Sequence, residues 1–280
     1  MTRWITPFTN ELPTMSDQAP IKDECRVSGA ATFRVLGETA ELMAVDKPPF
    51  LLVHPSKPGG PVTLWDRLRE LLAYEIASGG QVSLINRLDR ETSGIILVAK
   101  TASAARFAAM AMARGVISKE YLALVSGWPV AEEWKADLPL LRLGEVSPSR
   151  IWLKRAVHPS GAPSRTGFRV LRRLHHPEQG PISLLRCVPH TGRTHQIRVH
   201  LAHGGHPVLG DKIYGPDEGC YLDFMESGWT PRLEDLLWLP RHALHSCMLG
   251  IRFEGVDHRW ESPFPPDLQS VLDACADVPA

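Results

Sequence analysis

The sequence predicts an α+β fold built on a mixed, mainly antiparallel sheet with flanking helices. Three observations indicate this fold. Short apolar segments rich in β-branched residues recur along the chain, helical patterns are fewer, and the two kinds of segment do not alternate as they do in βαβ folds. The chain has 280 residues, of which 44% are hydrophobic, so it can bury a substantial core.

The N-terminal part of the chain begins without a clear pattern. Residues 1–30 show no periodicity and are expected to form an extended lead-in to a single domain at 31–280. Strands are predicted at FRVL, ELMAV and FLLV within 33–53, where Gly, Asp and Pro separate the apolar runs. A helix is predicted to begin at Thr63, whose hydroxyl can cap it, and to end at Gly79.

The middle of the chain contains a buried strand, a helix and further strands. GIILVAK (94–100) is typical of a buried strand, and the alanine-rich segment 101–114 is typical of a helix closed by Gly115. Strands are predicted at 121–125 and, within 151–188, at IWLKRAV, TGFRVLRRL and ISLLRCV.

The C-terminal part returns to mixed structure. A short helix is predicted at 194–203, and residues 210–240 are expected to be mostly loop. HALHSCMLGIRF (242–253) is typical of a long strand, and 266–276 of a closing helix.

Charge is balanced over the whole chain, with 31 basic and 31 acidic residues, which argues against a nonspecific nucleic-acid binder. The window 142–200 nevertheless holds eleven Lys and Arg against two acidic residues, and six of the twelve histidines. This window predicts a local surface for an anionic partner. The alternative is that its arginines alternate along solvated strands.

Cysteine usage and hydropathy limit the compartment. The five cysteines are odd in number and form no CxxC pair, so neither a disulfide framework nor a thiolate zinc site is indicated. No apolar run approaches the roughly 20 residues that span a bilayer, and the N-terminus lacks the apolar core of a signal peptide. A cytoplasmic protein without a membrane partner is therefore expected.

The segment RLDRETSG (87–94) places Asp89 between two arginines and near hydroxyl groups. A carboxylate beside cations and hydrogen-bond donors has a low pKa and stays ionised at neutral pH. Such an aspartate can serve as a nucleophile, a base or a metal ligand. The alternative is a surface turn with an ion pair, and these residues alone do not exclude it.

The segment GRTHQIRVH (192–200) predicts a helix that Thr194 caps and that carries Arg198 one turn further on. An arginine in this position can clamp a carboxylate with two hydrogen bonds. Nearby histidines resemble metal ligands, but their spacing differs from HExxH and no acidic residue lies among them; they are His195, His200, His203 and His206. We therefore expect hydrogen bonding to backbone, carboxylate or phosphate groups, and no metal.

The strand segment SKEYLALV (118–125) presents Tyr121. This residue can be an ordinary half-buried strand tyrosine, or it can stack on a base that has left its helix. The residues themselves leave the two interpretations open.

Together these segments resemble the pseudouridine synthases of the RluA family, which act on ribosomal large-subunit and transfer RNA. The matching stretches follow the family's order over about 40–250; they are VDKPPFLLVHPS (45–56), NRLDRETSGIILVAK (86–100), SKEYLALVSG (118–127), GRTHQIRVHLAHGGHPVLGDKIYG (192–215) and RHALHS (241–246). The combination of RLDxxTSG with a later GRTHQIRxH is specific to this family.

The resemblance implies that residues 31–280 form a pseudouridine synthase catalytic domain, an isomerase that turns uridine into pseudouridine in ribosomal or transfer RNA. It implies that Asp89 is the catalytic nucleophile, that Arg198 pairs with it, and that Tyr121 stacks on the flipped base and takes part in proton transfer. Contacts with the substrate RNA are expected from four further residues, which are Arg87, Leu244, Arg193 and His195.

The resemblance also implies that no metal or organic cofactor is used. Nothing in the sequence requires a dimer, so a monomer without an obligate protein partner is expected. The RNA-binding module found ahead of the catalytic domain in many relatives is not expected here. Asn86 and Phe50 stand where the family usually has His and Gly. Two alternatives are a catalytically inactive RNA-binding relative and a metal-dependent hydrolase that uses the histidines.

Overall fold

The protein is described by a computed structural model that covers residues 32–55 and 59–278. The helices are α1 (Leu64–Leu71), α2 (Ala73–Ala77), α3 (Ala102–Ala113), α4 (Gln196–His203), α5 (Gly219–Ser227), α6 (Pro231–Leu237) and α7 (Pro266–Asp273), with a 3₁₀ turn η1 (Leu143–Glu145). The strands are β1 (Arg34–Glu38), β2 (Leu42–Lys47), β3 (Ser83–Leu84), β4 (Ser93–Ala99), β5 (Ser118–Ser126), β6 (Glu133–Asp137), β7 (Leu140–Arg142), β8 (Arg155–Val157), β9 (Arg165–His176), β10 (Gly180–Pro189), β11 (Leu244–Phe253), β12 (Val256–Glu261) and β13 (Ala276–Asp277).

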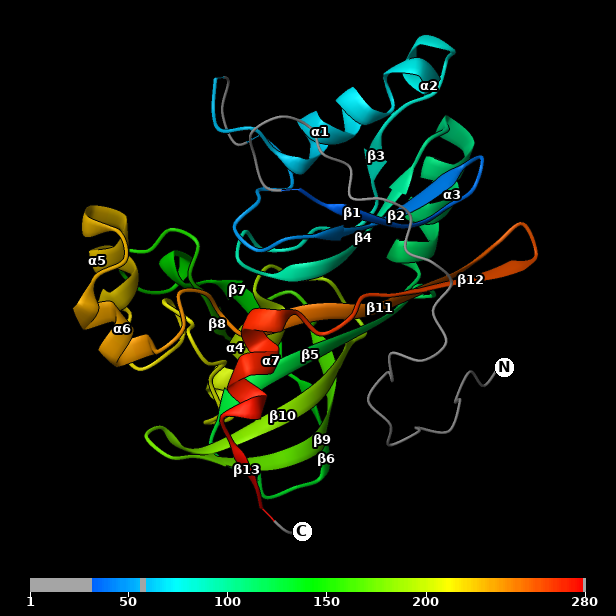
Figure 1. The fold of residues 1–280 in the computed structure, drawn as a ribbon. Helices are drawn as coiled ribbons and strands as arrows, with labels where there is room; N and C mark the ends of the chain where they lie inside the picture. The colour runs from blue at the N-terminus through cyan, green and yellow to red at the C-terminus, as the bar shows by residue number, and fades with distance from the viewer. Residues whose placement is uncertain (1–31, 56–58, 279–280) are drawn as a thin grey trace.

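One long sheet runs through the molecule in the order β1-β2-β4-β11-β5-β10-β9-β13, with β3, β6 and β12 joined at its sides (Figure 1). β7 and β8 pair separately. Among the described strands, β4 and β11 are parallel and the other ladders are antiparallel. The expected α+β fold with a mainly antiparallel sheet is therefore confirmed, whereas the lead-in predicted at 1–30 lies outside the described residues.

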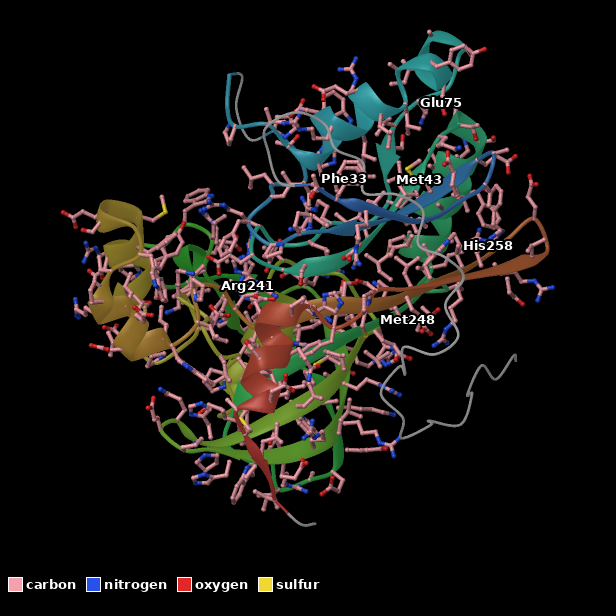
Figure 2. All side chains as sticks on the ribbon, in the orientation of Figure 1. Phe33, Met43, Glu75, Arg241, Met248 and His258 are labelled. Atoms are coloured by element: carbon pink, nitrogen blue, oxygen red, sulfur yellow. The ribbon has the colours of Figure 1, made fainter. Side chains whose placement is uncertain are left out.

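Helices cover both faces of the central strands. Ile95 and Leu97 of β4 belong to a core cluster with the buried alanines of α3. Ile96 and Val98 point the other way, into a larger cluster that includes side chains of α1, α4 and α7. Phe33, labelled in Figure 2, also belongs to this larger cluster. Because both faces are covered, β4 is buried along its whole length and its sequence is a continuous apolar run.

The parallel pairing of β4 with β11 brings together the loops that precede these strands, which contain residues of RLDRETSG and RHALHS. Ser93 lies opposite His245, and Gly94 lies opposite Ser246. Gly94 has φ +108°, and a Cβ atom there would lie 2.2 Å from the carbonyl oxygen of Ser246, so only glycine fits. Since the two strands run in the same direction, the loops that precede them emerge at the same end of the sheet.

Two apolar segments predicted as strands differ in the structure. In the run FLLV (50–53), the carbonyl groups of Leu52 and Val53 accept hydrogen bonds from the first amides of α1, at 2.8 and 3.1 Å, and not from a neighbouring strand. In IWLKRAV, ladder pairing is limited to β8. The strand predicted at FLLV was therefore wrong, and the one predicted at IWLKRAV was wrong in part. An apolar run can be buried in a loop, or exposed at a turn, without pairing as a strand.

Helix predictions also differ in two places. Residues 210–240, expected to be mostly loop, contain α5 and α6. The start of α6 had a readable signal, because Thr230 caps it and a proline follows. The predicted Thr194 cap is wrong, since the N-cap residue of α4 is His195, which has φ +58° and makes no side-chain capping bond. The helix from Thr63 does form with its capping box, but it is interrupted at Leu72.

Candidate active site

Asp89 lies in a tight turn immediately before β4. The amide of Thr92 donates a hydrogen bond to the Asp89 carbonyl (3.1 Å), which closes the turn. Lys47, at the end of β2, is fully buried, and its ammonium group donates to three carbonyl groups, of which one is that of Arg90 (3.2 Å). The stretch VDKPPFLLVHPS, through Lys47, therefore holds the backbone of RLDRETSG in place.

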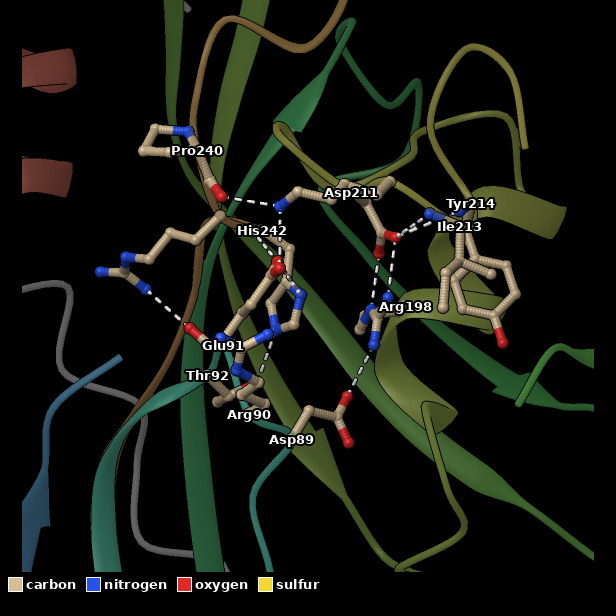
Figure 3. A network of polar contacts seen from close by, with 12 residues as sticks. Asp89, Arg90, Glu91, Thr92, Arg198, Asp211, Ile213, Tyr214, Pro240 and His242 are labelled. Atoms are coloured by element: carbon tan, nitrogen blue, oxygen red, sulfur yellow. Dashed lines mark hydrogen bonds and ion pairs between the residues drawn. The ribbon is translucent and has the colours of Figure 1, made fainter. Parts of the chain in front are cut away.

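Arg198 lies between two carboxylates (Figure 3). Its Nη1 donates to Oδ2 of Asp89 at 2.8 Å. On the other side, its Nε and Nη2 donate to the two carboxylate oxygens of Asp211, at 2.6 and 2.8 Å. The expected pairing of Arg198 with Asp89 is present in this geometry, but the two-bond clamp falls on Asp211.

Asp211 was not singled out by the sequence, although it lies in the motif stretch GDKIYG. Its side chain is fully buried, and its Oδ1 also accepts hydrogen bonds from the amides of Ile213 and Tyr214, at 3.0 and 3.1 Å. These amides fix the carboxylate, and the carboxylate in turn fixes the guanidinium. Burial raises the pKa of Asp211, but the charge and hydrogen bonds of Arg198 outweigh this effect and hold the pKa well below its usual value.

Asp89 remains ionised although it is largely enclosed. Its side chain is 27% exposed, so a ligand can reach it. Burial raises the pKa of Asp89, but His195, Arg198 and His242 together hold that pKa well below its usual range. Burial lowers the pKa of His195 to about 4, so this imidazole is neutral at pH 7. At neutral pH the charge that keeps Asp89 ionised is therefore that of Arg198.

A second chain of polar contacts leads from Tyr214 through His195 to Asp89. Nδ1 of His195 lies 2.8 Å from the hydroxyl of Tyr214, which accepts a hydrogen bond from the amide of Arg155 (2.8 Å). When the hydroxyl donates to Nδ1, the imidazole proton sits on Nε2, which is 3.9 Å from Oδ2 of Asp89. Burial raises the pKa of Tyr214, so its hydroxyl keeps the proton that this arrangement needs.

Glu91 joins the Asp89 turn to two later motifs. Its carboxylate accepts from Lys212 Nζ at 2.8 Å and from the backbone amide of His242 at 3.2 Å, as Figure 3 shows. The Nε2 atom of His242 lies 2.7 Å from the hydroxyl of Thr92. Burial raises the pKa of Glu91, but the hydrogen bonds and charges of His242 and Lys212 outweigh this effect and lower the pKa to about 2. This network connects RLDRETSG, GDKIYG and RHALHS, and the sequence did not assign it.

Tyr121 and Leu244 come from the adjacent strands β5 and β11. Tyr121 lies opposite Ser246 and Leu244 opposite Ala123, and both side chains are buried in the larger core cluster. Burial and the nearby negative charge of Asp89 raise the pKa of Tyr121 to about 12. The sheet register thus brings Tyr121 near the carboxylate, with Leu244 in the same apolar wall.

Among the described residues, Arg87 and Arg193 form no ion pair with Asp89, whose partners are Arg198 and His195. Both are exposed, and the Nε atom of Arg193 donates to the carbonyl of Pro163 (3.2 Å). Their expected contacts with RNA stay a prediction. Asn86, in contrast, is buried, and its amide group bridges the carbonyl of Ile95 and an amide of β4, so it tethers the turn to the sheet.

The histidines of the fourth motif stretch have separate partners. His200 contacts the hydroxyl of Thr166 (2.9 Å) and the carbonyl of Leu138 (3.0 Å), and His206 contacts the carbonyl of Ser126 (3.0 Å). Within residues 32–55 and 59–278, no group of three His, Cys, Asp or Glu side chains is arranged to hold a metal ion. Over the same residues, no helix combines the length and apolar character needed to cross a bilayer.

The basic window 142–200 is largely compensated by carboxylates. Seven of its eleven basic residues form ion pairs; they are Arg142, Lys154, Arg169, Arg172, Arg173, Arg186 and Arg198. The four that form none with the described residues are Arg150, Arg155, Arg165 and Arg193. Arg193 precedes α4 and Arg165 begins β9, and the side chain of Gln196, at the start of α4, contacts the backbone of both (3.0 Å each). The surface for an anionic partner stays a prediction, and these four residues are its remaining candidates.

Comparison with known proteins places this site in a family context. A family model described as RNA pseudouridylate synthase matches residues 41–203. The chain is 34% identical over 260 residues to the ribosomal large subunit pseudouridine synthase D of Nitrosomonas europaea, covering 92% of this chain and 69% of the relative. It is 33% identical to the protein of the same name from Haemophilus ducreyi, covering 92% and 75%.

Solved structures agree on the fold. Human RNA pseudouridylate synthase domain containing 1 superimposes with a TM-score of 0.66 at 24% identity, covering 88% of this chain and 89% of that one. Human RNA pseudouridylate synthase domain containing 4 gives a TM-score of 0.64 at 21% identity, covering 86% and 92%. At these identities the likeness concerns the fold alone.

Proposed function

The chain belongs to the RNA pseudouridylate synthase family, and we propose that it isomerises uridine to pseudouridine in large-subunit ribosomal RNA with Asp89 as the catalytic nucleophile. The observation that carries the proposal is the Asp89 carboxylate itself, which is partly exposed and hydrogen-bonded to the buried Arg198. The choice of ribosomal RNA is supported by the names of the relatives from Nitrosomonas and Haemophilus.

The residues at the site match what the reaction requires. The N1–C1′ bond breaks, the uracil turns, and C5 bonds to C1′, while C5 loses a proton and N1 gains one. An ionised carboxylate can attack the sugar at C1′, or it can assist loss of the 2′ proton, and both routes need Asp89 in the charged form that Arg198 favours. The target must leave its stack, which costs a few kcal/mol, so RNA loops are suitable substrates.

Tyr121 is proposed to stack on the flipped uracil and to assist the proton transfer from C5. While Asp89 is ionised, its charge helps to keep the phenol protonated. If Asp89 forms an ester with the sugar, that charge disappears and the phenol ionises more readily. Tyr121 would therefore become a better base at the step in which C5 must lose its proton. Leu244 would contribute to the apolar wall around the base.

The experiment that tests the proposal combines cells and purified protein. Pseudouridines in total RNA are mapped by carbodiimide-dependent primer-extension stops in cells with and without the gene, and the deletion strain is complemented with wild type or Asp89→Asn. We expect one or a few ribosomal positions to be lost on deletion, restored by the wild type and not by Asp89→Asn. The control Asp257→Asn, at an exposed ion pair, should restore them.

Other results would contradict parts of the proposal. Restoration by Asp89→Asn would remove that residue from its role as nucleophile. Loss of pseudouridine from transfer RNA alone would overturn the choice of ribosomal RNA. No product from purified wild type on RNA extracted from the deletion strain, despite tight binding to that RNA, would favour an inactive RNA-binding relative.

A further inference from the structure

The loop between β7 and β8 gathers exposed apolar side chains. Val146 is 47% exposed, Trp152 73% and Leu153 44%. Single exposed apolar residues are ordinary on protein surfaces, but a local group of them often marks an interaction site. The same loop is basic, because residues 142–155 contain four Lys or Arg and one acidic residue. Its chemistry therefore suits a partner that is both anionic and apolar in part.

Trp152 is presented by a built turn. The carbonyl of Ile151 accepts a hydrogen bond from the amide of Lys154 (3.1 Å), which makes Trp152 and Leu153 the two central residues of a turn. Ile151 is buried, and the hydroxyl of Ser149 bonds both its amide and its carbonyl. Gly, Asn, Asp, Pro and Ser normally occupy central turn positions, so folding does not account for two large apolar residues at this tip.

One face of the Trp152 ring is already occupied. The guanidinium carbon of Arg142 lies 3.6 Å from the ring centroid, which is a close cation–π contact. Because the residue is still 73% exposed, its opposite face is open to solvent. An indole backed by a guanidinium is a flat surface on which an unpaired nucleic-acid base can stack.

The turn is linked to the candidate active site by a short chain of contacts. Arg155, which follows the turn, donates its amide proton to the Tyr214 hydroxyl. That hydroxyl contacts His195, which in turn faces Asp89. On the other side, Lys154 pairs with Glu218 at the start of α5. The Nε atom of Arg155 is buried without a hydrogen-bond partner among the described residues. The guanidinium group therefore has an unsatisfied donor close to the candidate active site.

We propose that Trp152 stacks on an unpaired base of the substrate RNA close to the target uridine, with Arg142 fixing the ring and Arg150 and Arg155 facing the phosphates. This inference rests on the proposed function and adds a specificity-determining contact to it. Stacking tolerates every base, so the contact selects a splayed loop near the target and not a particular sequence. It therefore selects RNA shape before Asp89 acts.

The test uses the full chain and protein-free ribosomal RNA from cells that lack the gene. Trp152→Ala should raise KM for this RNA by about tenfold or more, with a much smaller change in kcat, because one stacked base is lost. Trp152→Phe should recover most of the affinity. Tyr74→Ala is the matched control, since Tyr74 is an 82% exposed aromatic residue on α2, and its KM should equal that of wild type.

Photocrosslinking provides an independent readout. The same RNA, transcribed with 5-iodouridine, should crosslink to the peptide that carries Trp152, and the crosslink should disappear in Trp152→Ala. Unchanged KM in Trp152→Ala would overturn the inference, and so would the absence of a crosslink at this peptide. If Trp152→Ala turns over free RNA normally and loses activity only on assembled ribosomal subunits, the inference is also overturned, and the turn would instead contact a protein partner.

The two proposals fail in different ways. If purified wild type gives no product on any RNA, the proposed function fails, and the crosslink still decides whether a base stacks on Trp152. If wild type is active and both Trp152 variants match it in KM, the inference fails and the proposed function stands.

Discussion

Replacing Asp211 with asparagine tests whether the buried carboxylate positions Arg198 for Asp89. The substitution keeps the size of the side chain but removes its charge. The Oδ1 of Asp211 serves two backbone amides and Nη2 of Arg198, so an asparagine oxygen would stay at that position. The new NH₂ group would then face the Nε–H of Arg198 across the 2.6 Å that now separates acceptor and donor.

The size of the effect follows from burial. Two donors cannot share that distance, and the guanidinium, whose side chain is 5% exposed, would lose one of its two charged partners. Removing one partner of a buried ion pair costs about 3–5 kcal/mol, and we expect about 3 kcal/mol because Asp89 remains. A displacement of Arg198 by about 1 Å can lower turnover by about 10²-fold. Binding of RNA should change much less.

The assay measures urea unfolding, RNA affinity and tritium release from RNA labelled at uracil C5. Asp223→Asn is the control, because Asp223 forms an exposed pair with Arg232 at the same 2.6 Å and its loss should cost less than about 1 kcal/mol. Asp211→Asn with unchanged kcat and a free energy of unfolding within about 0.5 kcal/mol of wild type would refute the reasoning.

The remaining predictions concern proton transfer, backbone strain and acid stability. Tyr121→Phe should keep RNA affinity and lose about 10²- to 10⁴-fold in turnover, as expected for a proton-transfer group; near-normal tritium release would leave stacking as its only role. Phe50→Gly should raise the free energy of unfolding by about 1 kcal/mol, because Phe50 has φ +67° and is 41% exposed; urea unfolding with no gain would show that its contacts outweigh the strain. Stability should fall as pH drops from 6.5 toward 4, because buried His195 and His245 have pKa values near 4 and only the unfolded chain takes up protons in that range. The loss is at most about 3 kcal/mol for each imidazole. It continues from pH 4.5 toward 2, because Glu91 has a pKa of about 2 in the folded protein and takes up its proton first in the unfolded chain; a flat unfolding midpoint between pH 6.5 and 4 would contradict this.

The structural effects of the two departures from the family pattern, Phe50 and Asn86, became clear only with backbone geometry. The resemblance implied a glycine at position 50, and Phe50 has φ +67°, a backbone conformation that glycine adopts without strain. The resemblance implied a histidine at position 86, and the two hydrogen bonds of Asn86 to β4 give it a structural role. The sequence marked both positions as unusual, but φ angles and hydrogen-bond partners are not visible in a string of residues.

The sequence by itself determined the fold class, the family and the residues of the two main motifs. Local signals suffice for these features, because apolar runs, helix caps and a fixed order of short motifs are properties of neighbouring residues. The strand at 94–100 and the helix that begins at Thr63 are examples, and both are present in the structure. The run at 50–53 was misread because burial alone does not distinguish a loop from a strand.

Only the tertiary structure decided which of these residues meet. Asp89 and Arg198 are 109 positions apart, and the partner that clamps Arg198 is Asp211, which no local pattern singles out. The parallel pairing of β4 with β11 brings the loops before both strands to one end of the sheet. Pairing between distant strands depends on the packing of the whole core, and a carboxylate shows its role only when its buried partners are known.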